Sequence, residues 1–269
     1  MNSNLKTPSG KESSTTAVPR TTADIPYEAF AMAYDRALGE RFFAAIAPML
    51  DAAIGRHGLQ GGRHLDLACG TALAIPHLEA RGFRSTGVDF SMAMLRQARP
   101  RSSRLVAGDL RRLPLSGPFD VLTCLYDSLN HLLEPQELTL AFRSIRSVMG
   151  KRSLLMFDMN HPDIYPAVWG TKEPYVASGP DYLLRMHTSF DKRAGIGTAV
   201  VTGWSRKSGG GRIEIEEVHR QRSYDERKIR TCLRAGGIEV IEMIAFDPFD
   251  EMEALLARGV KMLFVCRAM

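Results

Sequence analysis

The chain has 269 residues, 45% of them hydrophobic, which is enough apolar material for one substantial core and permits one or two domains. We expect one domain with an insertion. The formal net charge of +5 raises the question of a nucleic-acid partner. The arginine-rich stretches contain almost no interleaved aromatic residues, however, so the sequence disfavours nucleic acid.

The four cysteines, Cys69, Cys124, Cys232 and Cys266, are widely spaced and form no CxxC pair. This spacing favours neither a disulfide framework nor a zinc site. No apolar run approaches the length of a membrane span, and the first residues lack the apolar core of a secretory signal. We therefore expect a protein of the reducing cytoplasm that has no membrane partner.

Residues 1–24 are rich in serine, threonine and proline and poor in large apolar side chains. Such a segment buries too little surface to offset the entropy of ordering, so we expect a disordered tail. An organellar transit peptide is the less favoured alternative, because arginines are few and no amphipathic pattern appears. Apolar residues at helical spacing then predict two helices, Tyr27–Leu38 and Phe42–Gly55.

A short apolar strand at His64–Leu67 contains Asp66 and leads into a turn of small residues at 68–72. The nucleotide-binding turn of dehydrogenases has three glycines and receives a pyrophosphate at a helix N-terminus. Here Ala72 stands where the third glycine would fall. Asp66, at the mouth of the loop, would repel phosphate and attract a cation or an ammonium group. The turn therefore predicts an adenosyl ligand that carries positive charge.

Three further strands follow this turn. Ser85–Phe90 contains Asp89 about 20 residues past the turn, the spacing at which an acid accepts hydrogen bonds from both ribose hydroxyls. A third strand ends near Asp109, and Phe119–Leu125 is an apolar run suited to a buried fourth. The segments between and after these strands predict helices near Thr71–Ala80, Ser91–Ala98 (capped by Ser91) and Pro135–Val148, and a fifth strand at Leu154–Phe157. This alternation predicts an α/β fold with a parallel, doubly wound sheet and ligands outside the C-terminal strand ends.

The pattern changes after Asp158, where short polar-apolar stretches are separated by turns that contain glycine. These stretches predict an antiparallel meander with strands at Tyr182–Phe190, Thr198–Ser205 and Ile213–Ser223. Ser208–Gly211 is interpreted as a hairpin turn rather than a phosphate loop, because a strand follows it. The main pattern then resumes with helix Asp225–Ala235 and strands Ile238–Phe246 and Lys261–Arg267.

The strand ends and turns resemble those of the class I S-adenosylmethionine-dependent methyltransferases. Asp66, Gly70 and Asp89 match the pattern of that family. Ala68 and Ala72 depart from it, since many members carry glycine there, but alanine still allows close approach. The resemblance implies S-adenosylmethionine as co-substrate, S-adenosylhomocysteine as product, and a Rossmann-like fold with a mostly parallel seven-stranded sheet.

The likeness is closer to the small-molecule methyltransferases, and two segments carry it. One is Tyr34-Asp35-Arg36 with Arg41-Phe42-Phe43; the other is Asp127–Leu132, which reads Asp-Ser-Leu-Asn-His-Leu. The resemblance runs from about Tyr27 to the C-terminus. It implies a methyltransferase domain over 25–269, in which 163–224 form an inserted antiparallel β-sheet cap that covers the active site and shapes the choice of acceptor.

The resemblance also implies which residues bind the cofactor. Asp109 resembles the acid that contacts the adenine amino group, with Leu110 beside the ring; a solvated loop acid is the alternative. For Asp66 the alternative is a helix cap, and for Asp89 a surface acid at a strand end. The predicted cofactor-binding residues are Tyr34, Asp66, Ala68, Cys69, Gly70, Asp89, Phe90, Met94, Asp109, Leu110 and Leu125. No metal is predicted, because His161 and Asp163 lack a third ligand.

Methyl transfer from this cofactor is an in-line displacement, so most of the acceleration comes from alignment in a water-poor pocket, and a base is optional. His131 is the predicted proton acceptor, with helix capping or packing as the alternative. Tyr34 is predicted to close over the cofactor, with core packing as the alternative. Asp158, Asn160 and His161 are expected to reach the acceptor from the opposite rim.

The remaining histidines are interpreted as structural: His57, His64, His77, His187 and His219. The sequence thus favours methyl transfer to a small metabolite. Alternatives are a protein that binds S-adenosylmethionine without catalysis, an RNA or DNA methyltransferase, and a nicotinamide oxidoreductase. The acceptor, the methylated element and the choice between monomer and homodimer stay open.

Overall fold

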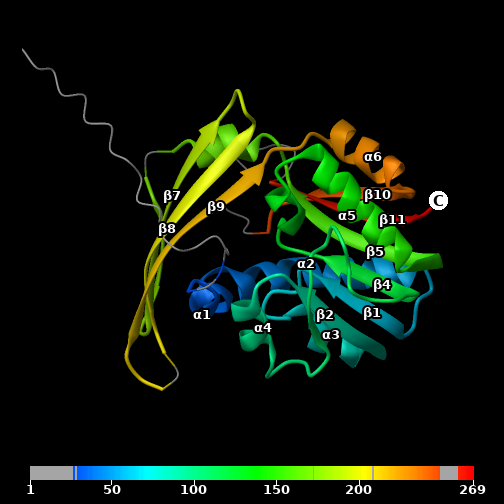
Figure 1. Ribbon diagram of the computed structural model, residues 1–269, viewed down its shortest axis with the longest axis horizontal. Helices are drawn as coiled ribbons and strands as arrows, with labels where there is room; N and C mark the ends of the chain where they lie inside the picture. The colour runs from blue at the N-terminus through cyan, green and yellow to red at the C-terminus, as the bar shows by residue number, and fades with distance from the viewer. Residues whose placement is uncertain (1–26, 28, 172, 208, 249–259) are drawn as a thin grey trace, which may run out of the picture.

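A seven-stranded sheet forms the centre of the protein (Figure 1), in a computed structural model that describes residues 27, 29–171, 173–207, 209–248 and 260–269. The strand order is β10-β11-β5-β4-β1-β2-β3, and β11 runs in the direction opposite to the other six strands. The strands are β1 (Gly62–Leu67), β2 (Phe83–Asp89), β3 (Leu105–Ala107), β4 (Phe119–Cys124), β5 (Met149–Asn160), β10 (Ile238–Phe246) and β11 (Lys261–Ala268). The predicted doubly wound, mostly parallel sheet is confirmed. The tail predicted at 1–24 lies outside the described residues.

Helices cover both faces of this sheet. On one face, α5 (Pro135–Ser147) and α6 (Glu226–Ala235) pack in a cluster where the ring centroids of Phe142 and Phe157 lie 5.6 Å apart. On the other, α2 (Glu40–Arg56) and α3 (Ala74–Ala80) pack against the strands through residues such as Leu50. Because both faces are buried, the central strands are largely apolar. Among the described residues, no helix has the length and apolar character needed to cross a membrane.

The N-terminal helices differ from the prediction of two separate helices. The described chain forms one continuous run, in which α1 (Ala31–Tyr34) passes through a π-helical turn (Asp35–Gly39) into α2. Gly39 lies inside this helical run and does not end it. A Cβ at this position would lie only 3.0 Å from Leu73 Cδ1, so the glycine allows close packing and does not form a turn. Such π turns occur often at functional sites.

A second, antiparallel sheet lies between β5 and α6 in the sequence. Its order is β6-β7-β8-β9, with β6 (Tyr175–Gly179), β7 (Tyr182–Asp191), β8 (Ile196–Arg206) and β9 (Arg212–Arg222). We call it the cap sheet. It stands beside the main sheet, and α1 lies between the cap sheet and α4 (Met92–Ala98) (Figure 1). Three of its strands confirm the predicted meander.

The fourth strand, β6, was not predicted, because it is a short edge strand that contains alanine, serine and glycine and pairs only with β7. Residues 209–211 lie in the turn between β8 and β9, as expected, and Ser208 lies outside the described residues. Helix α4 begins as predicted, with Ser91 Oγ accepting a hydrogen bond from the Met94 amide. Helix α3, in contrast, begins at Ala74 instead of Thr71, because the turn after β1 extends further than expected.

Candidate active site

The turn after β1 is held in left-handed backbone conformations. Gly70 has a φ of 54°, as its predicted turn role requires, and Ala68 and Ala72 have φ values of 49° and 65°. The Cys69 amide donates to the carbonyl oxygen of Val88 at 2.9 Å, which ties the turn to the end of β2. The turn therefore brings the acids at the ends of β1 and β2 to one place.

These two acids are buried without a cationic partner. Asp89 accepts the amide hydrogens of Gly70 and Ser91, each at 2.7 Å, and Asp66 accepts the Thr123 hydroxyl at 2.6 Å. Burial, with the charge of Asp89, raises the pKa of Asp66 to about 7 although Thr123 lowers it; burial also raises the pKa of Asp89. Within the described chain, neither carboxylate forms a salt bridge. The site therefore carries unbalanced negative charge.

A cavity of about 270 Å³ opens above these carboxylates. All predicted cofactor-binding residues and His131 line it: Tyr34, Asp66, Ala68, Cys69, Gly70, Asp89, Phe90, Met94, Asp109, Leu110, Leu125 and His131. One wall is apolar, and Phe90 leaves 59% of its surface exposed there. The structure thus brings the predicted residues together, and their individual roles remain predictions.

The described residues between 27 and 39, here called the roof segment, cover the cavity with Tyr27 and Tyr34. Glu217 of β9 accepts three of its backbone amides, from Tyr27 and Ala29 at 2.7 Å each and from Phe30 at 2.9 Å. The roof segment is therefore fastened to the cap sheet.

The other end of the roof segment is fastened to the turn after β1. Asp35 forms a salt bridge of 2.8 Å with Arg101 and accepts a hydrogen bond from the Thr71 hydroxyl. The roof segment thus spans from the cap sheet to the turn that carries Gly70.

Comparisons with known proteins place this architecture. Residues 65–152 match the family model of a methyltransferase domain. A protein of Geobacillus sp. (strain WCH70), named as a candidate methyltransferase, is 28% identical over 239 residues, 84% of this chain and 93% of the relative. A crystal structure of an S-adenosylmethionine-dependent methyltransferase from Clostridium acetobutylicum ATCC 824 aligns with a TM-score of 0.72 and 19% identity, over 89% of this chain and 97% of that chain. The chain therefore contains a methyltransferase domain over residues 65–152 and has the fold of S-adenosylmethionine-dependent methyltransferases.

A second solved structure shares the fold. An amino pentose methyltransferase from Micromonospora echinaspora, solved with bound S-adenosylmethionine, aligns with a TM-score of 0.65 and 21% identity, over 87% of this chain and 94% of that chain. S-adenosylmethionine also suits the cavity of the present protein. Its positive charges complement the buried carboxylates of Asp66 and Asp89, which have no cation of their own in the described chain.

His131 ends a short 3₁₀ turn after β4 and faces the roof segment. Its Nε2 lies 3.1 Å from the Tyr27 hydroxyl and 3.3 Å from the Gln221 side-chain amide nitrogen, while the ring also hydrogen-bonds the backbone of Arg220. Burial lowers the pKa of His131 to about 4, against the opposing charge of Asp127. The imidazole of the methyltransferase is therefore neutral at pH 7, with Nε2 as an acceptor toward Tyr27 and Gln221.

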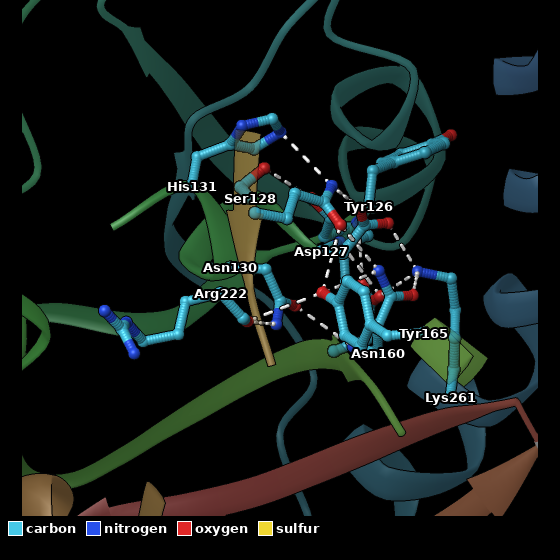
Figure 2. A network of polar contacts seen from close by, with 12 residues as sticks. Tyr126, Asp127, Ser128, Asn130, His131, Asn160, Tyr165, Arg222 and Lys261 are labelled. Atoms are coloured by element: carbon cyan, nitrogen blue, oxygen red, sulfur yellow. Dashed lines mark hydrogen bonds and ion pairs between the residues drawn. The ribbon is translucent and has the colours of Figure 1, made fainter. Parts of the chain in front are cut away.

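Beside His131, a buried polar network joins strands from three parts of the chain (Figure 2). Lys261 of β11 lies between Asp127, at 2.5 Å, and Asp158, at 3.0 Å, and also donates to Asn160 at 3.0 Å. Gln221 of β9 donates to Asp127 and accepts from Asn160 at 2.9 Å. Burial alone would lower the pKa of Lys261, but the two carboxylates outweigh it and raise that pKa, so the lysine is a cation.

This network corrects the expectation that Asp158, Asn160 and His161 reach the acceptor. Asp158 is fully buried and accepts the amides of Tyr126 and Asp127, at 2.6 and 3.0 Å, and it does not line the cavity. Both of those amides belong to residues with left-handed φ, and their backbone needs a buried acceptor. The side-chain oxygen of Asn160 likewise accepts a buried hydrogen bond, from Lys261. Asn160 and His161 do not line the cavity.

His161 lies 3.6 Å from Asp163. Among the described residues, no three His, Cys, Asp or Glu side chains come together where they could hold a metal ion. His219, interpreted as structural, lies nearer to the site than expected: its ring centroid is 4.6 Å from that of Tyr27 and 6.3 Å from that of His131.

Sequence reasoning missed several residues that build the site. Tyr27, Tyr126 and Ser128 line the cavity, and Glu217 and Gln221 support it from the cap sheet. The sequence of β9 carries no signal for Glu217 and Gln221, because residues 216–222 are polar on both faces except at Val218, and only the structure shows that positions 217, 219 and 221 are buried.

Proposed function

We propose that the methyltransferase transfers a methyl group to the nitrogen or oxygen atom of a small-molecule acceptor that carries an exchangeable proton. The neutral His131 is the observation that carries this proposal. The backbone of Arg220 takes the other side of the ring, so the Nε2 lone pair, which accepts from the Tyr27 hydroxyl and the Gln221 amide in this structure, is the basic site at the cavity wall. An acceptor with an N–H or O–H group would replace the Tyr27 hydroxyl as a donor to this nitrogen.

The cofactor takes the half of the cavity formed by the ends of β1 and β2. Asp66 lies opposite the ammonium group, Asp89 accepts the ribose hydroxyls, and Asp109 with Leu110 contacts adenine. Phe90 and Met94 belong to the adenine wall, while Ala68, Cys69 and Gly70 supply close backbone approach and Leu125 supplies apolar contact. The buried, unpaired carboxylates and the exposed Phe90 ring support this assignment.

When bound, S-adenosylmethionine supplies an electrophilic methyl group. His131 accepts a hydrogen bond from the acceptor and so turns the acceptor's own lone pair toward that methyl group. Tyr34 and Tyr126 exclude water from the reacting centre, because both line the cavity and pack with ring centroids 6.0 Å apart. After transfer to a hydroxyl oxygen, His131 can take the released proton and pass it to solvent, whereas an ammonium product loses its proton directly to solvent, because the lowered pKa of His131, about 4, makes the imidazole a weak base.

Several observations support a small acceptor in place of RNA or DNA. The amino pentose methyltransferase that shares the fold is named for a small substrate. The cap sheet, within the segment 163–224, fastens the roof segment over the cavity, which suits selection of a small acceptor. We place the methyltransferase domain at 25–269 and the protein in the cytoplasm, as a monomer or homodimer.

Titration calorimetry with S-adenosylhomocysteine, run beside NAD, tests the cofactor site first. Micromolar binding of S-adenosylhomocysteine with no binding of NAD is the expected result. A panel of amines and hydroxylated metabolites is then screened for S-adenosylhomocysteine release.

With an acceptor in hand, His131→Ala should lower turnover by about a hundredfold while cofactor affinity changes little. His57→Ala, at an exposed position after α2, is the matched control and should leave both unchanged. Unchanged turnover in His131→Ala would remove His131 from the mechanism. Binding without turnover for every acceptor class would favour a protein that binds the cofactor without catalysis.

A further inference from the structure

A chain of hydrogen bonds crosses the centre of the main sheet and ends on Asp66. His64 of β1 places Nδ1 2.9 Å from the Ser85 hydroxyl of β2 and Nε2 2.9 Å from the Thr123 hydroxyl of β4. Thr123 in turn donates to Asp66 Oδ1 at 2.6 Å. Ser85, His64 and Thr123 are fully buried, and Asp66 is 3% exposed. The chain therefore runs inside the protein to the cavity floor.

These polar side chains occupy a place where apolar ones are expected. The central strands of a sheet covered on both faces are normally apolar. Val121 is paired with His64 in the register of β1 and β4 and belongs to the apolar cluster that α2 and α3 form with the sheet. Burying polar groups is costly unless each finds a partner, and a well-packed apolar set would avoid that cost. The presence of these hydrogen-bonded polar side chains in the sheet therefore has a cause other than packing.

The series of hydrogen bonds from Ser85 to Asp66 has a direction. Each hydroxyl has one proton to donate, and Thr123 donates its proton to Asp66, so the Thr123 oxygen must accept from His64. This puts the imidazole proton on Nε2 and leaves Nδ1 to accept from Ser85. Burial lowers the pKa of His64 to about 3, so the ring is neutral and carries a single proton. One arrangement of protons satisfies all three bonds, and it points toward the carboxylate.

We propose that Ser85, His64 and Thr123 are positioning residues for Asp66. Through them the Thr123 hydroxyl is committed as a donor to Oδ1, which favours the ionised carboxylate and leaves Oδ2 for the ammonium group of S-adenosylmethionine. This inference rests on the proposed placement of that ammonium group beside Asp66.

The other titratable groups around Asp66 do not replace this donor. They are Asp89 from β2, Cys69 of the turn, Cys124 of β4 and Tyr126 after β4. Burial raises the pKa of both thiols and of the phenol, so these three are neutral at pH 7. Asp89 and burial disfavour the ionised form of Asp66, and the Thr123 bond opposes them.

The test is S-adenosylhomocysteine affinity measured by calorimetry from pH 6 to 9. Thr123→Val should move the pH midpoint of binding up by about one unit and so weaken binding about threefold at pH 7.5, because Asp66 loses its donor. His64→Leu should shift the midpoint the same way by less, since it leaves the Thr123 hydroxyl free to turn. Thr123→Ser keeps the hydroxyl and should keep the wild-type midpoint.

Val121→Ala is the matched control for stability, because it opens space beside His64 without touching the chain. It should lower the melting temperature and leave the pH midpoint unchanged. Wild-type midpoints in both Thr123→Val and His64→Leu would overturn the inference. Asp66→Asn separates the two proposals: loss of the pH dependence in this variant, with normal midpoints in the others, overturns the positioning role alone. Unchanged binding by Asp66→Asn overturns the cofactor assignment as well.

Discussion

At the scale of residues, the turn after β1 stores strain in two alanines. An L-residue in the left-handed region costs about 1 kcal/mol or more, and glycine avoids that cost. From the sequence, the alanines at 68 and 72 seemed of little consequence because alanine still allows close approach. The structure shows that the cost lies in backbone conformation, with φ values of 49° and 65°. Spacing predicted the turn, but a dihedral angle is not visible in a residue pattern.

Ala68→Gly should raise the free energy of unfolding by about 0.5–1 kcal/mol, because glycine relieves the left-handed strain. Ala72→Gly should gain less, since Ala72 is fully buried and packs in a small apolar cluster. Urea unfolding of the ligand-free protein measures both. Ala52→Gly, at an exposed position of α2, is the opposite-sign control and should lose about 1 kcal/mol. A loss in Ala68→Gly equal to that in Ala52→Gly would refute the strain argument.

At the scale of elements, strand β9 connects the cap sheet to both the roof segment and His131. Glu217 and Gln221 face inward from this strand, where Glu217 holds three roof amides and Gln221 reaches His131. Apolar runs that end in acids predicted the main strands and the cofactor side of the cavity, because that information is local. The contacts of β9 join residues 90 to 190 positions apart, and no spacing rule reports them.

Glu217→Gln should loosen the roof segment, because an amide offers one acceptor oxygen where the carboxylate offers two. A hydrogen bond to a charged group contributes about 1.5–3 kcal/mol, so exchange of the three roof amides should speed up, by about tenfold or more at Tyr27, whose amide alone bonds Oε2. Hydrogen exchange followed by mass spectrometry measures this. Glu216→Gln, on the exposed face of the same strand, should leave exchange at those amides unchanged. Equal exchange in the two variants would show that Glu217 does not fasten the roof segment.

At the scale of the whole molecule, the protein surrounds a cavity in which the carboxylates of Asp66 and Asp89 have no cationic partner among the described residues and are balanced only by a ligand. The pKa of Asp66 is raised to about 7 in the folded protein, so between its unfolded value and pH 7 the folded state binds the extra proton. The contribution of Asp66 to the free energy of unfolding of the ligand-free protein therefore falls as the pH rises to about 7. His64 and His131 are already neutral in this range because their pKa values are lowered to about 3 and 4.

A ligand with an ammonium group favours ionised Asp66, so S-adenosylhomocysteine should bind about tenfold more weakly at pH 6 than at pH 8. The rise in melting temperature on saturation with S-adenosylhomocysteine should accordingly be larger at pH 8. Thermal unfolding with and without ligand at both pH values measures the difference. Contributions of the histidines to the melting temperature are common to the bound and the free protein and cancel when the two are compared. An equal rise at the two pH values would mean that Asp66 does not titrate against the ligand.

The hydrogen bond from the Tyr27 amide to Glu217 also affects the order in which the protein folds during its synthesis. The ribosome makes the roof segment first, and its partner on β9 follows 190 residues later. Until β9 emerges, the nascent chain can pair β1 with β2 and β4 but has nothing to hold the roof segment over their ends. The cavity is therefore completed only after β9 has been synthesised, and the nascent polypeptide has no closed binding site before that point.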